Sequence, residues 1–103
     1  MPGEANELVH QPLRLRIMAV LNGLGSRESM EFTRLKSIVE ATDGNLGAHL
    51  STLEQAGYIK VEKDFVVKKP RTRVAMTREG RKALAQHVAY LRDILEGVEA
   101  SGG

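Results

Sequence analysis

One stretch of the chain, residues 42–57 (TDGNLGAHLSTLEQAG), has to face a core and a second surface at the same time. On a helix of about 100° per residue, Leu46, Leu50 and Leu53 fall within a narrow arc and form a stripe that packs on a core. The opposite face carries small or polar side chains and no long charged one: Gly44, Asn45, Ala48, Ser51, Thr52 and Gln55. Because an idle solvated face usually carries several Glu and Lys, this pattern indicates a face that is pressed against a partner.

The two ends of this helix are also marked. Thr42 suits the N-cap, Asp43 puts negative charge in the first turn, and Gly57 can take the left-handed conformation that ends a helix. Inside the helix, Gly44 and Gly47 each lower its stability by up to ~1 kcal/mol relative to Ala. Two reasons stay open: close packing of the preceding helix, or close approach of the backbone to a phosphate at the helix N-terminus.

The charge of the chain is unevenly distributed, although its formal net charge is only +2. Residues 58–82 contain nine Lys and Arg against three Asp and Glu, a local charge of +6, so the remainder carries −4. Such a basic stretch is typical of a surface that binds a polyanion, although a basic hairpin can also serve only to keep the surface solvated.

The composition excludes several classes of protein. A chain of 103 residues is one domain with a compact core. It has no cysteine, so it has no disulfide, no thiolate metal site and no cysteine nucleophile. It also has no apolar run as long as a signal peptide or a membrane span, so we expect a cytoplasmic protein.

No constellation of residues points to catalysis or to a cofactor. His10, His49 and His87 lack the spacing of a metal site, so we expect them at the surface or its boundary, with His49 half-buried beside the leucine stripe. No serine stands in a G-x-S-x-G elbow. We therefore expect no metal, no cofactor and no enzymatic activity.

The periodicity before residue 42 predicts two helices. Residues 1–8 show no clear period and are expected to be a flexible N-terminus. A first helix begins near Val9 and ends at residues 23–25, and a polar link at residues 28–30 follows, with room for a strand-like pair. Thr33 is expected to cap a second helix that ends near Ala41. Only one or two residues then separate it from the next helix, a spacing typical of a helix-turn-helix.

After Gly57 the hydrophobic period changes to two, which predicts a β-hairpin over residues 58–63 and 72–76. Its tip is expected near Lys68, Lys69 and Pro70, because proline belongs in a turn or on an edge. The stretch Phe65, Val66 and Val67 is more apolar than a tip requires. Those residues either extend the strand or pack on a neighbouring chain.

The last helix is expected to begin at the capping residue Thr77 and to carry an apolar seam. The seam recurs in steps of four and three: Leu84, Val88, Leu91, Leu95 and Val98. Such a seam can pack against its own domain or against a second chain. We favour dimerisation, because the helix is expected to extend beyond the compact body of the domain. Residues 99–103 are expected to be a flexible tail.

Three segments resemble small winged helix-turn-helix transcriptional regulators of the MarR/ArsR type: HQPLRLRIMAVL, FTRLKSIVEATDGNLGAHLSTLEQAGYIKVEK and RTRVAMTREGRKAL. The resemblance covers about residues 9–95. It implies a mainly α fold with a small β-hairpin wing, in a DNA-binding unit over residues 9–98 that includes a C-terminal dimerisation helix. It also implies a homodimer that binds double-stranded DNA sequence-specifically, and the alternative is a winged helix that binds only proteins.

The resemblance assigns roles to particular residues. It implies that helix 43–56 enters the major groove and that the wing, residues 58–77, reaches phosphates or a minor groove. The DNA-binding residues are then Gly44, Asn45, Ala48, Ser51, Thr52, Gln55, Lys68, Lys69, Arg71 and Arg73. The chain departs from the metal-sensing branch of these regulators, which uses cysteine clusters. It also lacks the long additional helices around the ligand pocket of larger members, and whether a small-molecule effector exists stays open.

Overall fold

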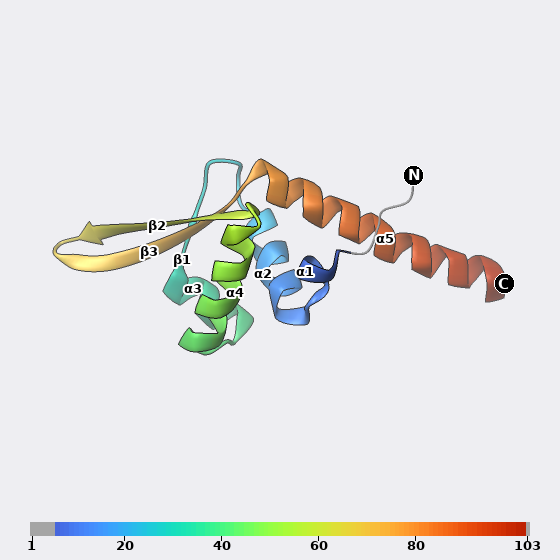
Figure 1. The fold of residues 1–103 in the computed structure, drawn as a ribbon, viewed down its shortest axis with the longest axis horizontal. Coiled ribbons are helices and arrows are strands. Elements are labelled where there is room, and N and C mark those ends of the chain that lie inside the picture. The colour runs from blue at the N-terminus through green and yellow to red at the C-terminus, as the bar shows by residue number, and fades with distance from the viewer. Residues whose placement is uncertain (1–5, 103) are drawn as a thin grey trace.

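The computed structural model describes residues 6–102, and the side chains of residues 6–97. In chain order this part contains α1 (Glu7–His10), α2 (Pro12–Asn22), β1 (Met30–Glu31), α3 (Phe32–Val39), α4 (Asp43–Gln55), β2 (Ile59–Val66), β3 (Lys69–Met76) and α5 (Arg78–Gly102). Helices α1 to α4 gather in a central body, from which the β2–β3 hairpin projects on one side and α5 on the other (Figure 1). The molecule is therefore elongated, with extents of 60 × 25 × 21 Å.

The core is built from every one of these elements. The buried apolar side chains are Val9, Ile17, Met18, Leu21, Met30, Leu35, Val39, Leu46, Leu50, Leu53, Ile59, Val74, Met76, Ala83 and Leu84. The stripe on α4 is confirmed, because its three leucines are at most 4% exposed. None of the helices in the described part of the chain is both long enough and apolar enough to cross a membrane.

The caps of α4 are as the sequence predicts, whereas that of α3 is not. The Thr42 hydroxyl accepts a hydrogen bond from the Asn45 N–H at 3.1 Å, and Gly57 has a φ of +82°. The expectation that Thr33 caps α3 is wrong, because α3 already begins at Phe32 and its N-cap, Glu31, makes no side-chain capping bond. The preceding strand β1 sets this start, since it pairs with β3 up to Glu31.

The three strands form one antiparallel sheet in the order β1-β3-β2. Strands β2 and β3 pair without a break from Ile59↔Met76 to Val66↔Lys69. Their two-residue turn consists of Val67 and Lys68, which both have positive φ angles, of 49° and 65°. Positive φ at both positions matches the tight turns that suit the twist of a hairpin.

This pairing shows which residues of the apolar tip extend the strand, and it corrects the place of one proline. Phe65 and Val66 extend strand β2. Pro70 is not in the turn but in β3, opposite Phe65. It is tolerated there because β1 pairs only with Arg73 and Val74, so β3 has a neighbour on one side only at Pro70.

The two ends of the chain are more helical than expected. Residues 1–5 of the expected flexible N-terminus lie outside the described residues, but Glu7 and Leu8 belong to α1. This helix forms because the Asn6 side chain accepts hydrogen bonds from the N–H groups of Leu8 and Val9, both at 3.1 Å. Helix α5 continues through Gly102, where a tail was expected from residue 99, because residues 98–101 (VEAS) contain no Gly or Pro to end it. The limits of the DNA-binding unit at residues 9 and 98 remain a prediction.

His87 was expected at the surface or its boundary, and this is wrong, because His87 is fully buried. Its Nε2 lies 3.1 Å from Nδ1 of His10, and its Nδ1 accepts a hydrogen bond from the Asn6 N–H at 3.3 Å. The His87 ring also stacks on Tyr90, with 5.8 Å between the ring centroids. Burial, and secondly the nearby His10, lower the pKa of His87. A neutral His87 therefore fastens α1 to α5.

The junction between the wing and α5 is tightly packed. The Thr77 hydroxyl donates a hydrogen bond to the Gly57 carbonyl at 2.6 Å and accepts one from the Gly80 N–H at 3.0 Å, which confirms Thr77 as the cap of α5. A Cβ atom on Gly80 would overlap the carbonyl oxygen of Tyr58 and lie 2.9 Å from the Met76 sulfur. A side chain at residue 80 would thus push α5 away from the root of the hairpin.

Candidate nucleic-acid interface

The outer face of α4 is open to solvent. Gly44, Asn45, Ala48, Ser51 and Gln55 are exposed, and Thr52 is half-buried. The Thr52 hydroxyl donates to the Ala48 carbonyl at 3.2 Å. Within residues 6–97, no other side chain of this face makes a hydrogen bond to the protein. The side-chain amides of Asn45 and Gln55 and the Ser51 hydroxyl are therefore available to a partner.

The two glycines of α4 do not make room for the preceding helix. A Cβ atom added to Gly44 or to Gly47 would meet no heavy atom within 4 Å. This contradicts close packing as their explanation and leaves close approach of a partner to the backbone. The first-turn N–H groups of a helix have no partner within it, and at this end of α4 only that of Asn45 is capped, by Thr42.

The edge of α4 beside the leucine stripe is held by α2. His49 is half-buried, as expected, and its Nδ1 lies 3.2 Å from Nη1 of Arg14. Because Arg14 can only donate, His49 accepts here and is neutral. Burial and the Arg14 charge both lower the pKa of His49. Arg14 also donates to the Leu8 carbonyl at 2.6 Å, so this arginine is used inside the protein.

The wing has two faces that differ in charge. Side chains alternate along a strand, so Lys63 and Phe65 share the face of Ile59 and Val61, which packs on the core beside α4. The opposite face of β2 carries Lys60, Glu62 and Asp64, and the residues paired with the last two, Arg73 and Arg71, lie on the same face of β3. All the acidic residues of the hairpin are therefore on the face turned away from the core.

Arg71, one of the expected DNA-binding residues, is engaged within that outer face. Its Nε and Nη2 donate to the two carboxylate oxygens of Asp64 at 2.9 and 2.7 Å, and its Nη1 lies 3.8 Å from Glu31. These hydrogen bonds hold the pKa of Asp64 below its ordinary value. Lys60 is similarly paired with Glu62 at 3.0 Å. In contrast, the described residues offer no ion pair to Lys63, Lys68 or Lys69.

A model of the winged helix DNA-binding domain matches residues 13–95, which is most of the chain. The chain belongs to this family. The winged helix domain is also 30% identical over 93 residues to an uncharacterized protein of Methanocaldococcus jannaschii, a match that covers 90% of this chain and 98% of the relative. The mainly helical fold with a small sheet and a wing is thereby confirmed.

Solved structures share the arrangement of this winged helix domain. A transcriptional regulator homologue from Pyrococcus horikoshii superposes with a TM-score of 0.80 at 28% identity, covering 90% of this chain and 89% of that one. A second structure, of smu.1704 from Streptococcus mutans, has a TM-score of 0.56 at 20% identity over 84% and 80% of the two chains, and shows the fold alone. The MarR or ArsR type remains an expectation from resemblance.

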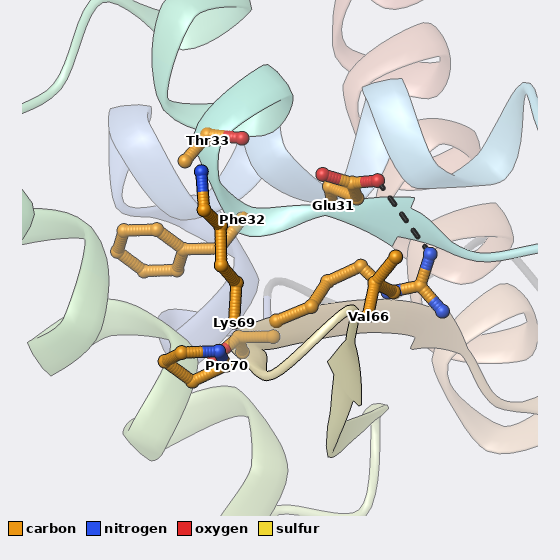
Figure 2. A pocket seen from close by; sticks show the side chains of 8 residues that line it. Glu31, Phe32, Thr33, Val66, Lys69 and Pro70 are labelled. Atoms are coloured by element: carbon orange, nitrogen blue, oxygen red, sulfur yellow. Dashed lines mark ion pairs between the residues drawn. The ribbon is translucent and has the colours of Figure 1, made fainter.

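A hollow of about 410 Å³ separates the wing from the start of α3. Figure 2 shows the Lys69 side chain extending from β3 toward Thr33 of α3, with the ion pair of Glu31 and Arg71 on the other side. The hollow is open, and polar and apolar groups are mixed along its walls. In the described part of the chain, no three His, Asp or Glu side chains gather so that they could hold a metal ion.

The expected dimerisation seam on α5 is divided by its contacts with the body of the winged helix domain. Leu84 is buried in the core, at 5% exposure, so its assignment to a dimer interface is wrong. Farther along the helix, Leu91 is half-buried, whereas Val88 and Leu95 are 38% and 65% exposed. The side chain of Val98 lies outside the described ones. Ile94, at 45% exposure, adds an apolar group that the spacing of the seam did not include.

Two exposed residues of the wing are not among the expected DNA-binding residues. Lys63 and Phe65 are both exposed, on the face that continues from the core. The signal that could have found them is the period of two, counted onward from Ile59 and Val61. It was missed because the sequence left open whether the strand continues beyond residue 63.

Proposed function

We propose that this protein is a transcriptional regulator that binds double-stranded DNA sequence-specifically as a homodimer, with α4 in the major groove. The observation that carries the proposal is the outer face of α4, which is exposed except for the half-buried Thr52 and carries no charged side chain, while the three leucines of the helix are buried. The likeness to the regulator homologue from Pyrococcus horikoshii supports it. Asn45 can then pair with adenine, and Ser51 and Thr52 with several bases.

A carboxylate in the middle of this face tests the proposal. Ala48 is exposed, so Ala48→Glu should change the melting temperature little, since exposed substitutions usually cost within ~0.5 kcal/mol. Against DNA it would bring a negative charge beside phosphates and hold α4 out of the groove. We expect specific binding to a duplex selected from random sequence to be abolished.

The matched control for this experiment is Ala85→Glu, the same change at an exposed position of α5. This variant should bind the selected duplex as the parent does. If Ala48→Glu also bound it as tightly as the parent, α4 would not be the reading surface. If the parent bound no duplex at any salt concentration, the protein-binding alternative would replace the proposal.

The wing is proposed to supply affinity through phosphate contacts. Lys68 and Lys69 are exposed and have no ion pair within the described residues, so they can reach phosphates without losing a partner. Arg73 is half-buried, and Arg71 would have to exchange Asp64 for a phosphate. Removing one phosphate contact lowers the slope of log affinity against log salt by about one unit. Lys68→Ala should show that change for all sequences alike, and an unchanged slope would contradict the role of Lys68.

The exposed part of α5 is proposed as the dimer interface. Val88, Leu91 and Leu95 lie on one side of the helix beyond the body, and an apolar stripe of this kind is stabilised by a second helix. Changing Leu91 and Leu95 together to Glu should give monomers in sedimentation and weaken DNA binding. The two α4 helices of a dimer would then read half-sites about 34 Å apart. A parent protein that is monomeric at micromolar concentration would refute the dimer.

A further inference from the structure

The tip of the wing carries apolar side chains where a hairpin usually carries polar ones. Phe65 is 75% exposed and Val67 is 90% exposed, and Pro70 stands opposite Phe65 across the strands. Phenylalanine and valine are among the side chains that proteins most often bury. In the described protein, the aromatic ring of Phe65 has no hydrophobic core around it.

One of these apolar residues, Val67, is held in a strained backbone conformation. Val67 has a φ of 49°, a left-handed conformation that is a genuine outlier for a β-branched residue. Asn and Gly fit this turn better, because they tolerate positive φ. Residues held in such conformations gather at functional sites, so the strain supports a role for the tip in binding.

The charges around the tip select a polyanion as its partner. Lys68 and Lys69 follow Val67 directly, and Lys63 shares the face of Phe65. Within residues 6–97 none of these three lysines has an ion pair. The acidic residues of the hairpin lie on the face opposite Phe65 and Lys63, the face that also carries Lys69. An apolar tip beside three lysines without ion pairs complements a duplex groove, which has phosphates on both walls and bases at its floor.

The length of the hairpin fits the neighbouring groove of that duplex. Phe65 is six residues beyond Ile59, which packs in the core beside α4, so it lies about 20 Å along the strand from that residue. In B-DNA, a major groove and the adjacent minor groove lie half a helical turn apart, about 17 Å. With α4 in the major groove, the hairpin is therefore long enough for its tip to reach the adjacent minor groove.

We propose that Phe65, supported by Val67, is an apolar wedge that enters this minor groove and partly unstacks a base step there. The inference rests on the proposed binding of duplex DNA and adds to it the residue and the groove. Apolar side chains that enter minor grooves commonly kink the duplex at flexible steps. The wing would thus read the deformability of the flanking sequence as well as hold its phosphates.

The test uses the full chain and a duplex selected from random sequence, with 2-aminopurine placed at steps of the flanking minor groove. We expect the parent to raise the 2-aminopurine fluorescence, because an unstacked base emits more strongly. Phe65→Ala should remove that rise and weaken binding about fivefold or more, as expected for the loss of one aromatic stacking contact. The salt slope should stay as in the parent, since no charge is lost.

Two controls separate the wedge from a phosphate contact and from general wing damage. Lys63→Ala, on the same face, should lower the salt slope by about one unit and keep the fluorescence rise. Val66→Ala, an exposed apolar residue on the opposite face, should bind and unstack as the parent does.

The outcomes distinguish the inference from the proposed function. If the parent binds the selected duplex and Phe65→Ala keeps both its affinity and its fluorescence rise, the wedge is refuted while DNA binding stands. If Phe65→Ala instead changes the sedimentation of the free protein, the tip is a contact between protein chains and the wedge is again refuted. If the parent binds no duplex, both proposals fall.

Discussion

Adding a methyl group to Gly44 should separate the stability of α4 from its DNA binding. In the free protein a Cβ at this position meets no heavy atom within 4 Å, so Gly44→Ala introduces no clash. Alanine is favoured over glycine by up to ~1 kcal/mol inside a helix. Because Gly44 lies in the first turn, we expect about half of that, which corresponds to a rise in melting temperature of about 2–4 °C.

On DNA the same methyl group should be unfavourable. The N–H groups of the first turn can donate to a phosphate only if the backbone comes within about 3 Å of it. The methyl carbon at residue 44 would hold a phosphate oxygen that lies over it at about 3.5–4 Å, the ordinary carbon contact distance, and so keep that oxygen from the N–H groups. Loss of one hydrogen bond to a charged group should weaken binding between about tenfold and a hundredfold. Thermal melting and a fluorescence-anisotropy titration with the selected duplex measure the two effects.

Gly97→Ala is the matched control for Gly44→Ala. Gly97 also has open space around it, but it lies in α5, away from the outer face of α4. This variant should be at least as stable as the parent and should bind DNA with unchanged affinity. The reasoning is refuted if Gly44→Ala melts below the parent, which would mean a hidden packing role, or if it binds the duplex as tightly as the parent.

Three further changes test the packing. The pKa of His87 is lowered by burial and by His10, so the stability that neutral His87 contributes is complete above its unfolded pKa of about 6.5 and is lost as the pH falls through its folded pKa. In urea unfolding, the free energy of unfolding should therefore decline between about pH 7.5 and pH 5, and a neutral replacement of His87 should reduce that decline. Gly80→Ala should lower stability by about 1–3 kcal/mol in thermal melting, because the Tyr58 backbone cannot move aside, and unchanged melting would contradict the close contact. Val67→Asn should stabilise the protein by up to ~1 kcal/mol and so raise its melting temperature, because Asn tolerates the positive φ at this position. A melting temperature below that of the parent would mean that the turn does not need a left-handed backbone there.

The features that follow from the sequence alone are those whose causes lie within one turn or one strand. The helix Asp43–Gln55 could be predicted with its cap, its end and its buried face, because Thr42, Gly57 and the three leucines act over a few residues. The wing followed from the change of period after Gly57. Its register did not, because the place of the turn depends on which residues of β2 and β3 pair.

The tertiary structure decided what each apolar face packs against. Spacing put Leu84 and Leu95 in one seam, but α5 crosses the body only along its first turns, so Leu84 enters the core and Leu95 remains exposed. His87 is buried because α1, from the other end of the chain, folds over it. Arg71 pairs with Asp64 only because the hairpin register places them opposite each other. Periodicity therefore determined which sides of the elements are apolar, and the packing of distant segments decided which of those sides, and which charges, remain available to DNA.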